Sequence, residues 1–187
     1  MIRKALTFLF SIYGFLVFLV LMFILLPFFI IAFCLPSPAN GNIVFVLSRI
    51  WARAFFLLTF IRFVSIPKTP LDQNQEYIFV CNHISYIDIP MMILATQGFN
   101  IRILGKAEMG KIPIFGFIYK MGTVSVQRSD PQKRNESIKK MKSFLDKNIS
   151  IMICPEGTFN MTRKPLKEFY DGAFRISIEC QKPIVPI

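Results

Sequence analysis

Acidic residues are absent from the first 71 positions of this 187-residue chain, and all 11 Asp and Glu residues lie from Asp72 onward. The same N-terminal part holds only six of the 22 basic residues. The rest of the chain therefore has the mixed charge expected of a folded domain with a solvated surface. The change in composition near Ile66 and Pro67 predicts a boundary between two units, residues 1–66 and residues 67–187.

Cysteine and histidine are scarce, with four Cys and one His in the chain. The cysteines lie far apart without a CxxC pair, which argues against a disulfide framework and against a zinc site. No GxSxG segment is present, which argues against a serine hydrolase with a covalent acyl-enzyme. The formal net charge is +11, but the basic residues are dispersed and the N-terminal ones flank apolar runs. A lipid surface is therefore favoured over nucleic acid as a partner.

Residues 5–35 carry no charge, and this apolar run exceeds the roughly 20 residues that cross a bilayer as a helix. It also exceeds the roughly 7–15 apolar residues of a signal peptide, which favours a retained membrane anchor. Pro27 predicts a kink in this helix. A second apolar run at 43–64 carries Arg49 and Arg53 on one helical face, as expected of an amphipathic helix in the membrane interface with its arginines among the headgroups. A hairpin that enters one leaflet and a true span both remain open.

After Pro70, short apolar runs alternate with segments of helical periodicity. The runs have the composition of strands buried on both faces, and they lie at 77–81, 101–105, 123–127, 150–154 and 183–187. The segments that we expect to be helical are 86–97, 112–121, 131–147 and 171–181. This alternation predicts an α/β fold with a mostly parallel sheet flanked by helices.

Polar or charged side chains follow four of the predicted strands, namely His83, Lys106, Arg128 and Glu156. Active groups gather at the carboxyl ends of the strands in such sheets, so we expect these residues at one edge. His83 and Asp88 could form a dyad in which Asp88 fixes the imidazole tautomer while the other ring nitrogen takes a proton from a hydroxyl. The residues alone also allow a structural histidine followed by an aspartate that stabilises the first turn of a helix.

The segment ICPEGTFN at 153–160 is a second candidate. It is either an ordinary turn with Thr158 as a helix cap, or a loop that binds an anionic headgroup, where Gly157 allows close approach of the backbone. Arg128 is either a solvated side chain or a two-pronged phosphate ligand. Lys106 is either surface charge or a second cation for that phosphate.

Asn82 and Ser85 flank the candidate dyad and are expected to support it and to take part in substrate binding. They belong to the first of four blocks, NHISYID at 82–88, TVSVQR at 123–128, PEGT at 155–158 and IVPI at 184–187. In order and approximate spacing these blocks resemble the four motif blocks of the 1-acylglycerol-3-phosphate acyltransferase family, glycerolipid acyltransferases with an H-x4-D motif. The segment KAEMGKIPIFG also resembles this family, and the resemblance covers residues 65–187. The apolar N-terminal helical pair is similar to the membrane anchor of bacterial members.

The resemblance implies acyl transfer from acyl-CoA or acyl-carrier protein to the sn-2 hydroxyl of lysophosphatidic acid, forming phosphatidic acid. It implies that His83, oriented by Asp88, is the base, and that Arg128 and the Glu156–Thr158 segment bind the glycerol phosphate. We expect no metal, no cofactor, no covalent acyl-enzyme and no nucleic-acid partner. The expected location is the bacterial inner membrane or its equivalent, with the catalytic domain at the cytoplasmic face.

Two features depart from the family pattern. Many members have arginine directly after Glu-Gly-Thr, where this chain has Phe159 and Asn160, with Arg163 a few residues later. The acceptor could therefore be another lysophospholipid or a lyso-aminolipid. The chain ends at Ile187, inside the last block, so we expect a catalytic domain truncated at its C-terminus. An inactive membrane-anchored module and a thioester hydrolase that uses the same dyad with water are the alternatives.

Overall fold

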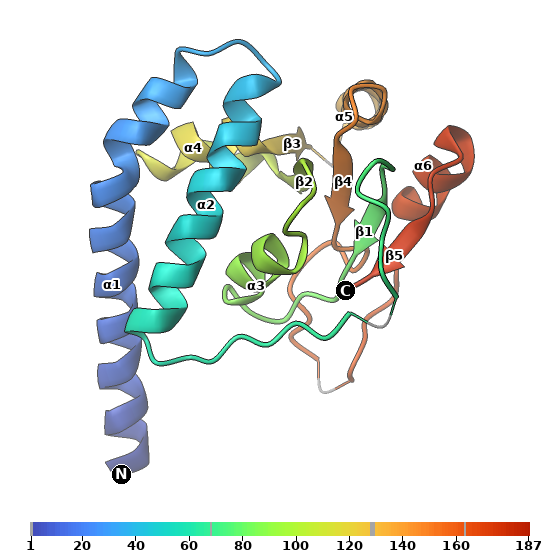
Figure 1. Ribbon diagram of the computed structural model, residues 1–187. Coiled ribbons are helices and arrows are strands. Elements are labelled where there is room, and N and C mark those ends of the chain that lie inside the picture. Colours follow the sequence, from blue (N-terminus) through green and yellow to red (C-terminus); the bar gives the residue numbers. More distant parts are fainter. Residues whose placement is uncertain (1, 68, 128–129, 163) are drawn as a thin grey trace.

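The computed structural model describes residues 2–67, 69–127, 130–162 and 164–187 (Figure 1). A five-stranded sheet has the order β3-β2-β4-β1-β5, and each pair of neighbouring strands is parallel. The strands are β1 (Ile78–Val80), β2 (Ile101–Lys106), β3 (Thr123–Val126), β4 (Ser150–Ile153) and β5 (Ile184–Pro186). Each strand lies within or next to a predicted apolar run, so all five strand predictions are confirmed.

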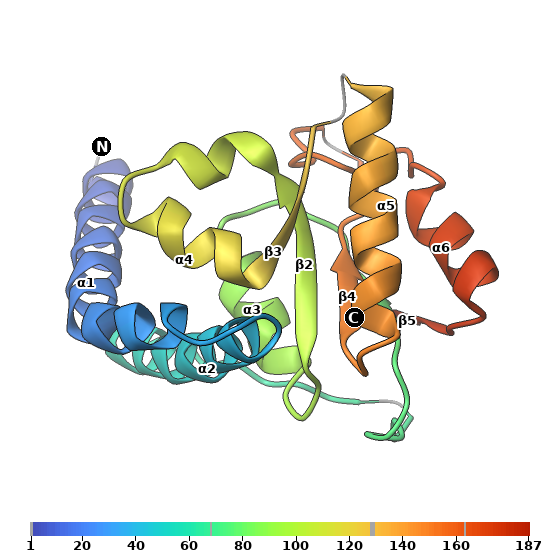
Figure 2. The same ribbon diagram turned by 90° about the horizontal axis from the view of Figure 1, so that it is seen from above.

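Helices cover both faces of this sheet, which confirms the predicted α/β class. They are α1 (Ile2–Phe33), α2 (Ala39–Leu58), α3 (Asp88–Ala95), the 3₁₀ helix η1 (Ala107–Lys111), α4 (Phe115–Gly122), α5 (Pro131–Leu145) and α6 (Gly172–Cys180). Figures 1 and 2 show α3 and α4 on one side of the sheet, with α1 and α2 stacked outside them, and α5 and α6 on the other side.

The alternation of side chains along the central strands builds two cores. In β4, Ile151 and Ile153 pack in the core formed with α5 and α6, whereas Met152 packs in the core formed with α3. In β1, Ile78 and Phe79 divide in the same way. Successive residues of a strand point to opposite faces, so a strand covered on both sides must be apolar throughout.

Helix α2 ends earlier than the apolar run at 43–64 predicts. Phe60 adopts a left-handed backbone conformation with φ of 57°. This turns the chain back, so that the Phe60 amide donates to Leu57 O at 3.2 Å and the Ile61 amide donates to Phe56 O at 2.9 Å. These two bonds form the Schellman motif that closes a helix. The prediction of a helix to residue 64 is therefore wrong, because hydrophobicity does not record the backbone conformation that ends a helix.

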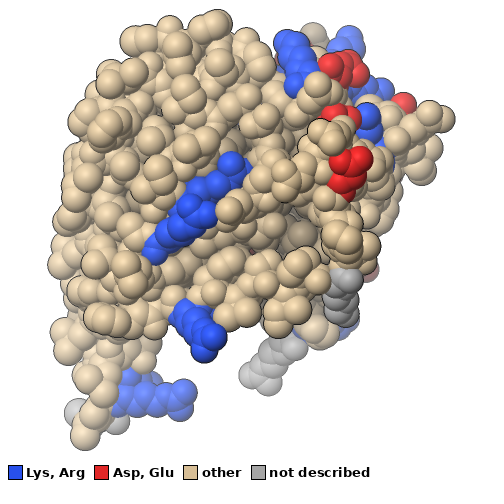
Figure 3. Space-filling model, viewed as in Figure 1, with Lys and Arg blue, Asp and Glu red and all other residues tan. Residues whose placement is uncertain are grey.

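Helices α1 and α2 are both long and apolar enough to cross a membrane. Helix α1 continues through Pro27, and its last turns lean toward the start of α2 (Figure 1). In Figure 3 the surface on the side of these helices is largely uncharged apart from separate basic side chains, and the visible acidic groups lie toward α5 and α6. Spanning and one-leaflet insertion both agree with this surface, and the division into 1–66 and 67–187 stays a prediction.

Three arginines join this helical pair to the α/β layers, and two of them belong to α2. Arg49 Nη2 donates to Thr96 O at 3.1 Å and to Phe99 O at 2.6 Å, beyond the last turn of α3. The prediction that Arg49 lies among lipid headgroups is therefore wrong, because its guanidinium bonds carbonyl groups of the protein. Arg53 is exposed and donates to Gln97 Oε1 at 2.6 Å.

Arg102 of β2 makes the second connection, to the start of α2. Its guanidinium donates to Pro38 O at 2.7 Å and to Asn42 Oδ1 at 3.1 Å. The side chain is 1% exposed, and burial lowers the pKa of Arg102 to about 10. Burial disfavours the charged form of a basic group, and the carbonyl partners compensate for part of that cost.

Candidate active site

The carboxyl ends of β1 and β4 lie side by side and carry the candidate site. The register pairs Val80 with Ile153, so His83 and Glu156 each stand three residues beyond paired positions. Between the paired residues and the candidate residues lie Cys81 and Cys154. Neighbouring parallel strands end at the same edge of a sheet, which is why the polar residues of two distant blocks meet here.

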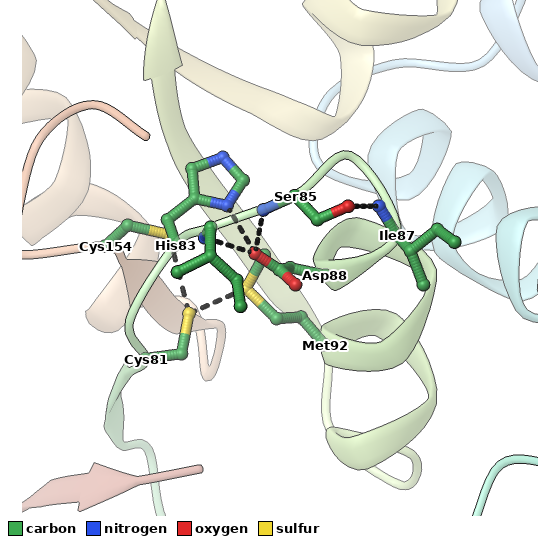
Figure 4. A network of polar contacts seen from close by, with 8 residues as sticks. Cys81, His83, Ser85, Ile87, Asp88, Met92 and Cys154 are labelled. Atoms are coloured by element: carbon green, nitrogen blue, oxygen red, sulfur yellow. Dashed lines mark hydrogen bonds and ion pairs between the residues drawn. The ribbon is translucent and has the colours of Figure 1, made fainter. Parts of the chain in front are cut away.

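The predicted contact between His83 and Asp88 is present. His83 Nδ1 lies 3.0 Å from Asp88 Oδ2, and the two side chains are 17% and 19% exposed. The same oxygen accepts the Ile84 amide at 2.7 Å and the Ser85 amide at 2.8 Å. Figure 4 shows the intervening turn wrapped around the carboxylate, while the other nitrogen of the imidazole points away from Asp88.

This arrangement sets the protonation of the ring. An ionised carboxylate only accepts hydrogen bonds, so Nδ1 of His83 carries the proton and donates it to Asp88. The neutral ring then has its lone pair on Nε2, the nitrogen directed away from Asp88 (Figure 4). The five-residue gap closes through the turn before α3, of which Asp88 is the first residue. The geometry is that of an oriented general base.

Two predicted supporting residues lie in or beside the same turn. Ser85 donates its amide to Asp88, and its Oγ accepts the Ile87 amide at 3.3 Å, so it shapes the turn that holds the carboxylate. Asn82 is exposed. The predicted support of the dyad is thus seen for Ser85, and a contact of Asn82 with a substrate stays a prediction.

The segment after β4 holds three more predicted residues in different environments. Glu156 is fully buried, and neither of its carboxylate oxygens has a hydrogen-bond partner within the described residues. Gly157 and Thr158 are partly exposed, and Gly157 has φ of 73°, a left-handed conformation that glycine adopts without strain. In this structure Gly157 and Thr158, rather than the carboxylate of Glu156, are accessible to a ligand.

Phe159 packs against the base itself. Its ring centroid lies 4.3 Å from that of His83 and 4.7 Å from that of Tyr86. The backbone N–H of the following residue, Asn160, donates a hydrogen bond to His83 O at 2.7 Å. The loop after β4 and the turn after β1 are therefore bound to each other beside the imidazole.

Sulfur atoms lie beside the dyad. Cys81 Sγ lies 3.4 Å from Cys154 Sγ and 2.7 Å from Met92 Sδ (Figure 4). Its hydrogen bond with Cys154, its burial and the nearby carboxylates of Asp88 and Glu156 raise the pKa of the Cys81 thiol. The thiol therefore stays protonated at neutral pH, which makes it a poor nucleophile.

The remaining predicted cations lie at other strand ends or outside the described residues. Lys106 is exposed at the end of β2, which β4 separates from β1 in the sheet. Arg128, like Arg163, lies outside the described residues. Within the described part of the chain, no group of three or more His, Cys, Asp or Glu side chains could hold a metal ion. The metal-free reaction stays a prediction.

Sequence reasoning did not assign a role to Tyr86, Phe159, Asn160 or Lys167. The ammonium of Lys167 donates a hydrogen bond to Thr158 Oγ1 at 2.9 Å, nine residues away in the chain. The departure from the family pattern at 159–160 was the available signal for two of these residues. The position of Lys167 depends on how the loop folds, and no spacing rule predicts it.

Several known proteins are similar to this chain. A family model described as "Acyltransferase" matches residues 62–187, more than half of the chain. The 1-acyl-sn-glycerol-3-phosphate acyltransferase of Cocos nucifera is 34% identical over 116 residues, which cover 61% of this chain and 37% of the relative. The Helicobacter pylori protein of the same name is 31% identical over 141 residues, covering 75% of this chain and 58% of that protein.

A solved structure has the same fold. The crystal structure of the 1-acyl-sn-glycerophosphate (LPA) acyltransferase PlsC from Thermotoga maritima aligns with a TM-score of 0.75 at 19% identity. The alignment covers 98% of this chain and 74% of that one. This chain spans 37% and 58% of the lengths of the two curated relatives described above.

Proposed function

The chain belongs to the acyltransferase family, and we propose that it transfers an acyl group from a thioester to the free sn-2 hydroxyl of lysophosphatidic acid, forming phosphatidic acid. The observation that carries this proposal is the His83–Asp88 pair at the carboxyl edge of the sheet. Beside it lies a partly exposed glycine–threonine segment suited to an anionic headgroup.

The reaction follows from the atoms of the dyad. Nε2 of His83 takes the proton of the acceptor hydroxyl as its oxygen attacks the thioester carbonyl carbon. The resulting tetrahedral intermediate expels the thiolate as the ester forms. The thiolate then takes the proton from Nε2, which gives a free thiol and restores the neutral ring. Asp88 stabilises the imidazolium between the two proton transfers, because its carboxylate accepts a hydrogen bond from Nδ1–H throughout while the proton stays on the nitrogen.

The headgroup and the acyl chains need different surroundings. The partly exposed Gly157 and Thr158, with Arg128 and Lys106 as cations, are the proposed contacts of the glycerol phosphate. For the acyl chains, exposed apolar side chains surround the turn and the loop, namely Ile84, Tyr86, Met161 and Leu166. The donor is acyl-CoA or acyl-carrier protein.

Attachment of the catalytic domain to a membrane suits a reaction whose lipid acceptor is embedded in the bilayer. Helices α1 and α2 are long and apolar enough to enter a bilayer, and α2 packs directly against α3 and α4. We place the protein in the bacterial inner membrane or its equivalent, with the α/β layers at the cytoplasmic face, where acyl thioesters are available.

The test uses the purified full chain in lipid vesicles. Lysophosphatidic acid and labelled oleoyl-CoA or oleoyl-carrier protein are supplied, and labelled phosphatidic acid is measured. We expect His83→Ala to lower the rate by about 10²–10⁴-fold, the contribution of a general base. Lys147→Ala, a change at an exposed lysine in the turn between α5 and β4, at the opposite edge of the sheet, serves as the control. A parent rate in His83→Ala would refute the mechanism, and release of fatty acid independent of lysolipid would identify a thioester hydrolase.

A further inference from the structure

The loop after β4 is pinned at two points around the candidate base. The Asn160 amide donates to His83 O at 2.7 Å, and the Tyr170 amide donates to Pro155 O at 2.9 Å. The ends of the segment 155–170 are thereby held together, and its early part lies against the turn that carries His83. The backbone at residues 155, 160 and 170 is therefore held beside the site by these two hydrogen bonds.

The residue directly after Thr158 cannot supply a cation, because it is Phe159 and its ring packs on His83 and Tyr86. The phosphate of an acceptor needs a positive partner, and the family pattern often places arginine at this position. In this chain an apolar ring covers one side of the imidazole instead. A charge for the phosphate must therefore come from another part of the site.

The side chain of Asn160 folds the next part of the loop back on itself. Its Oδ1 accepts the Thr162 amide at 3.0 Å and the Thr162 hydroxyl at 2.6 Å. Its Nδ2 donates to Lys164 O at 3.0 Å. This compact turn is followed by Lys167, whose ammonium donates to Thr158 Oγ1. The chain that departs from the family pattern at 159 and 160 thus brings a later cation back to the same segment.

We propose that Lys167, held by Thr158, binds the phosphate of the lysophosphatidic acid acceptor. An ammonium has three donors, and one bond to Thr158 leaves the others for phosphate oxygens. The Thr158 hydroxyl accepts from Lys167 and can donate its own proton to the same phosphate. Gly157 has no side chain to obstruct the approach. Hydrogen bonds between charged partners are the strong ones, so the pair contributes affinity as well as orientation.

The position of the Lys167–Thr158 pair agrees with the short separation between the phosphate and the sn-2 hydroxyl of the acceptor. Thr158 directly precedes Phe159, whose ring packs on His83, so the ammonium is bonded to the neighbour of a residue that touches the base. In the acceptor the phosphate and the sn-2 hydroxyl are likewise separated by only a few bonds. A phosphate at Lys167 would leave the hydroxyl to approach Nε2 of His83. This inference rests on the proposed function, because it assigns the substrate of the same site.

The experiment compares Lys167→Met with Lys164→Met, a matched change at another exposed lysine of the same loop. The full chain in phosphatidylcholine vesicles is assayed with varied lysophosphatidic acid at saturating oleoyl-CoA, and then with the two roles exchanged. We expect Lys167→Met to raise KM for lysophosphatidic acid by about 10-fold or more, the effect of one charged hydrogen bond. KM for oleoyl-CoA and the rate with neutral 1-acylglycerol should stay within about twofold of the parent, as should all values for Lys164→Met.

Several outcomes would overturn the assignment. An unchanged KM in Lys167→Met, or equal changes in both lysine variants, would remove Lys167 from the site. A rise in KM for oleoyl-CoA alone would show that Lys167 binds the donor's phosphates. Binding of lysophosphatidic acid to His83→Ala, followed by ³¹P NMR with and without Lys167→Met, separates this inference from the proposed function. A 10-fold loss of affinity there supports Lys167 even if the parent transfers no acyl group, and an equal affinity refutes it.

Discussion

Replacing Asp88 by asparagine tests the dyad without removing its shape. Asparagine keeps an oxygen that can accept the Ile84 and Ser85 amides, which lie 2.7 and 2.8 Å from Asp88 Oδ2 in the parent. It loses the negative charge that faces the imidazole at 3.0 Å. The fold of the turn should therefore survive, while the imidazolium formed in the reaction loses its counter-charge.

The size of the loss follows from this distance. Two unit charges 3.0 Å apart attract by about 5 kcal/mol at an effective dielectric constant of about 20. That constant suits side chains that are 17% and 19% exposed. The asparagine oxygen recovers part of the attraction through its dipole, so we expect a net loss of about 3–5 kcal/mol in the transition state. At about 1.4 kcal/mol for each tenfold change, the rate should fall by about 10²–10⁴-fold.

The assay measures labelled phosphatidic acid formed by the full chain in vesicles, with the thermal unfolding midpoint as a check of folding. Asp146→Asn makes the same change at an exposed aspartate after α5 and should keep the parent rate. The reasoning is refuted if Asp88→Asn retains a rate within about threefold of the parent while its unfolding midpoint is unchanged. A loss of both rate and folding would call for Asp88→Glu, which keeps the charge and should recover more activity than asparagine.

Three further changes probe the surroundings of the site. Phe159→Leu removes two ring contacts, each worth about 0.5–1.5 kcal/mol, so we expect a lower unfolding midpoint. Because the ring packs on His83, we also expect kcat to fall by about 3–10-fold. An unchanged kcat would show that the ring does not position His83. Glu156→Gln replaces a buried carboxylate that has no hydrogen-bond partner within the described residues. The free energy of unfolding should therefore stay equal or rise by about 1 kcal/mol. A clear fall in this free energy would reveal a stabilising role for the charge. Burial raises the pKa of the Tyr119 hydroxyl to about 12 in the folded state, from the ordinary value of 10.0. The contribution of this hydroxyl to stability is therefore complete below pH 10 and is lost as pH rises through 12. Tyr119→Phe should therefore lose less stability than the parent between pH 10 and 12 in denaturation experiments, and parallel curves would contradict this.

Local patterns carried most of the fold. The five apolar runs form strands and the four predicted helical segments of the α/β part form helices. Both were predictable because burial on two faces and helical periodicity are patterns of residues close together in the chain. Ends were less certain, as Phe60 shows: an apolar residue in a left-handed conformation stops α2 inside a run that remains apolar. The environment of Arg49 likewise depends on the carbonyl groups of Thr96 and Phe99, which only the packing of α3 against α2 brings within hydrogen-bond distance.

The sequence by itself determined the parallel α/β class, the apolar helical pair and the meeting of His83 with Asp88, because each follows from residues close together in the chain or from four blocks in a known order. Only the tertiary structure decided which side chains surround that pair. It buried Glu156, turned Phe159 onto the imidazole and returned Lys167 to Thr158. These placements depend on how one loop closes over a neighbouring strand end, and no periodicity or spacing in the chain records a closure of that kind.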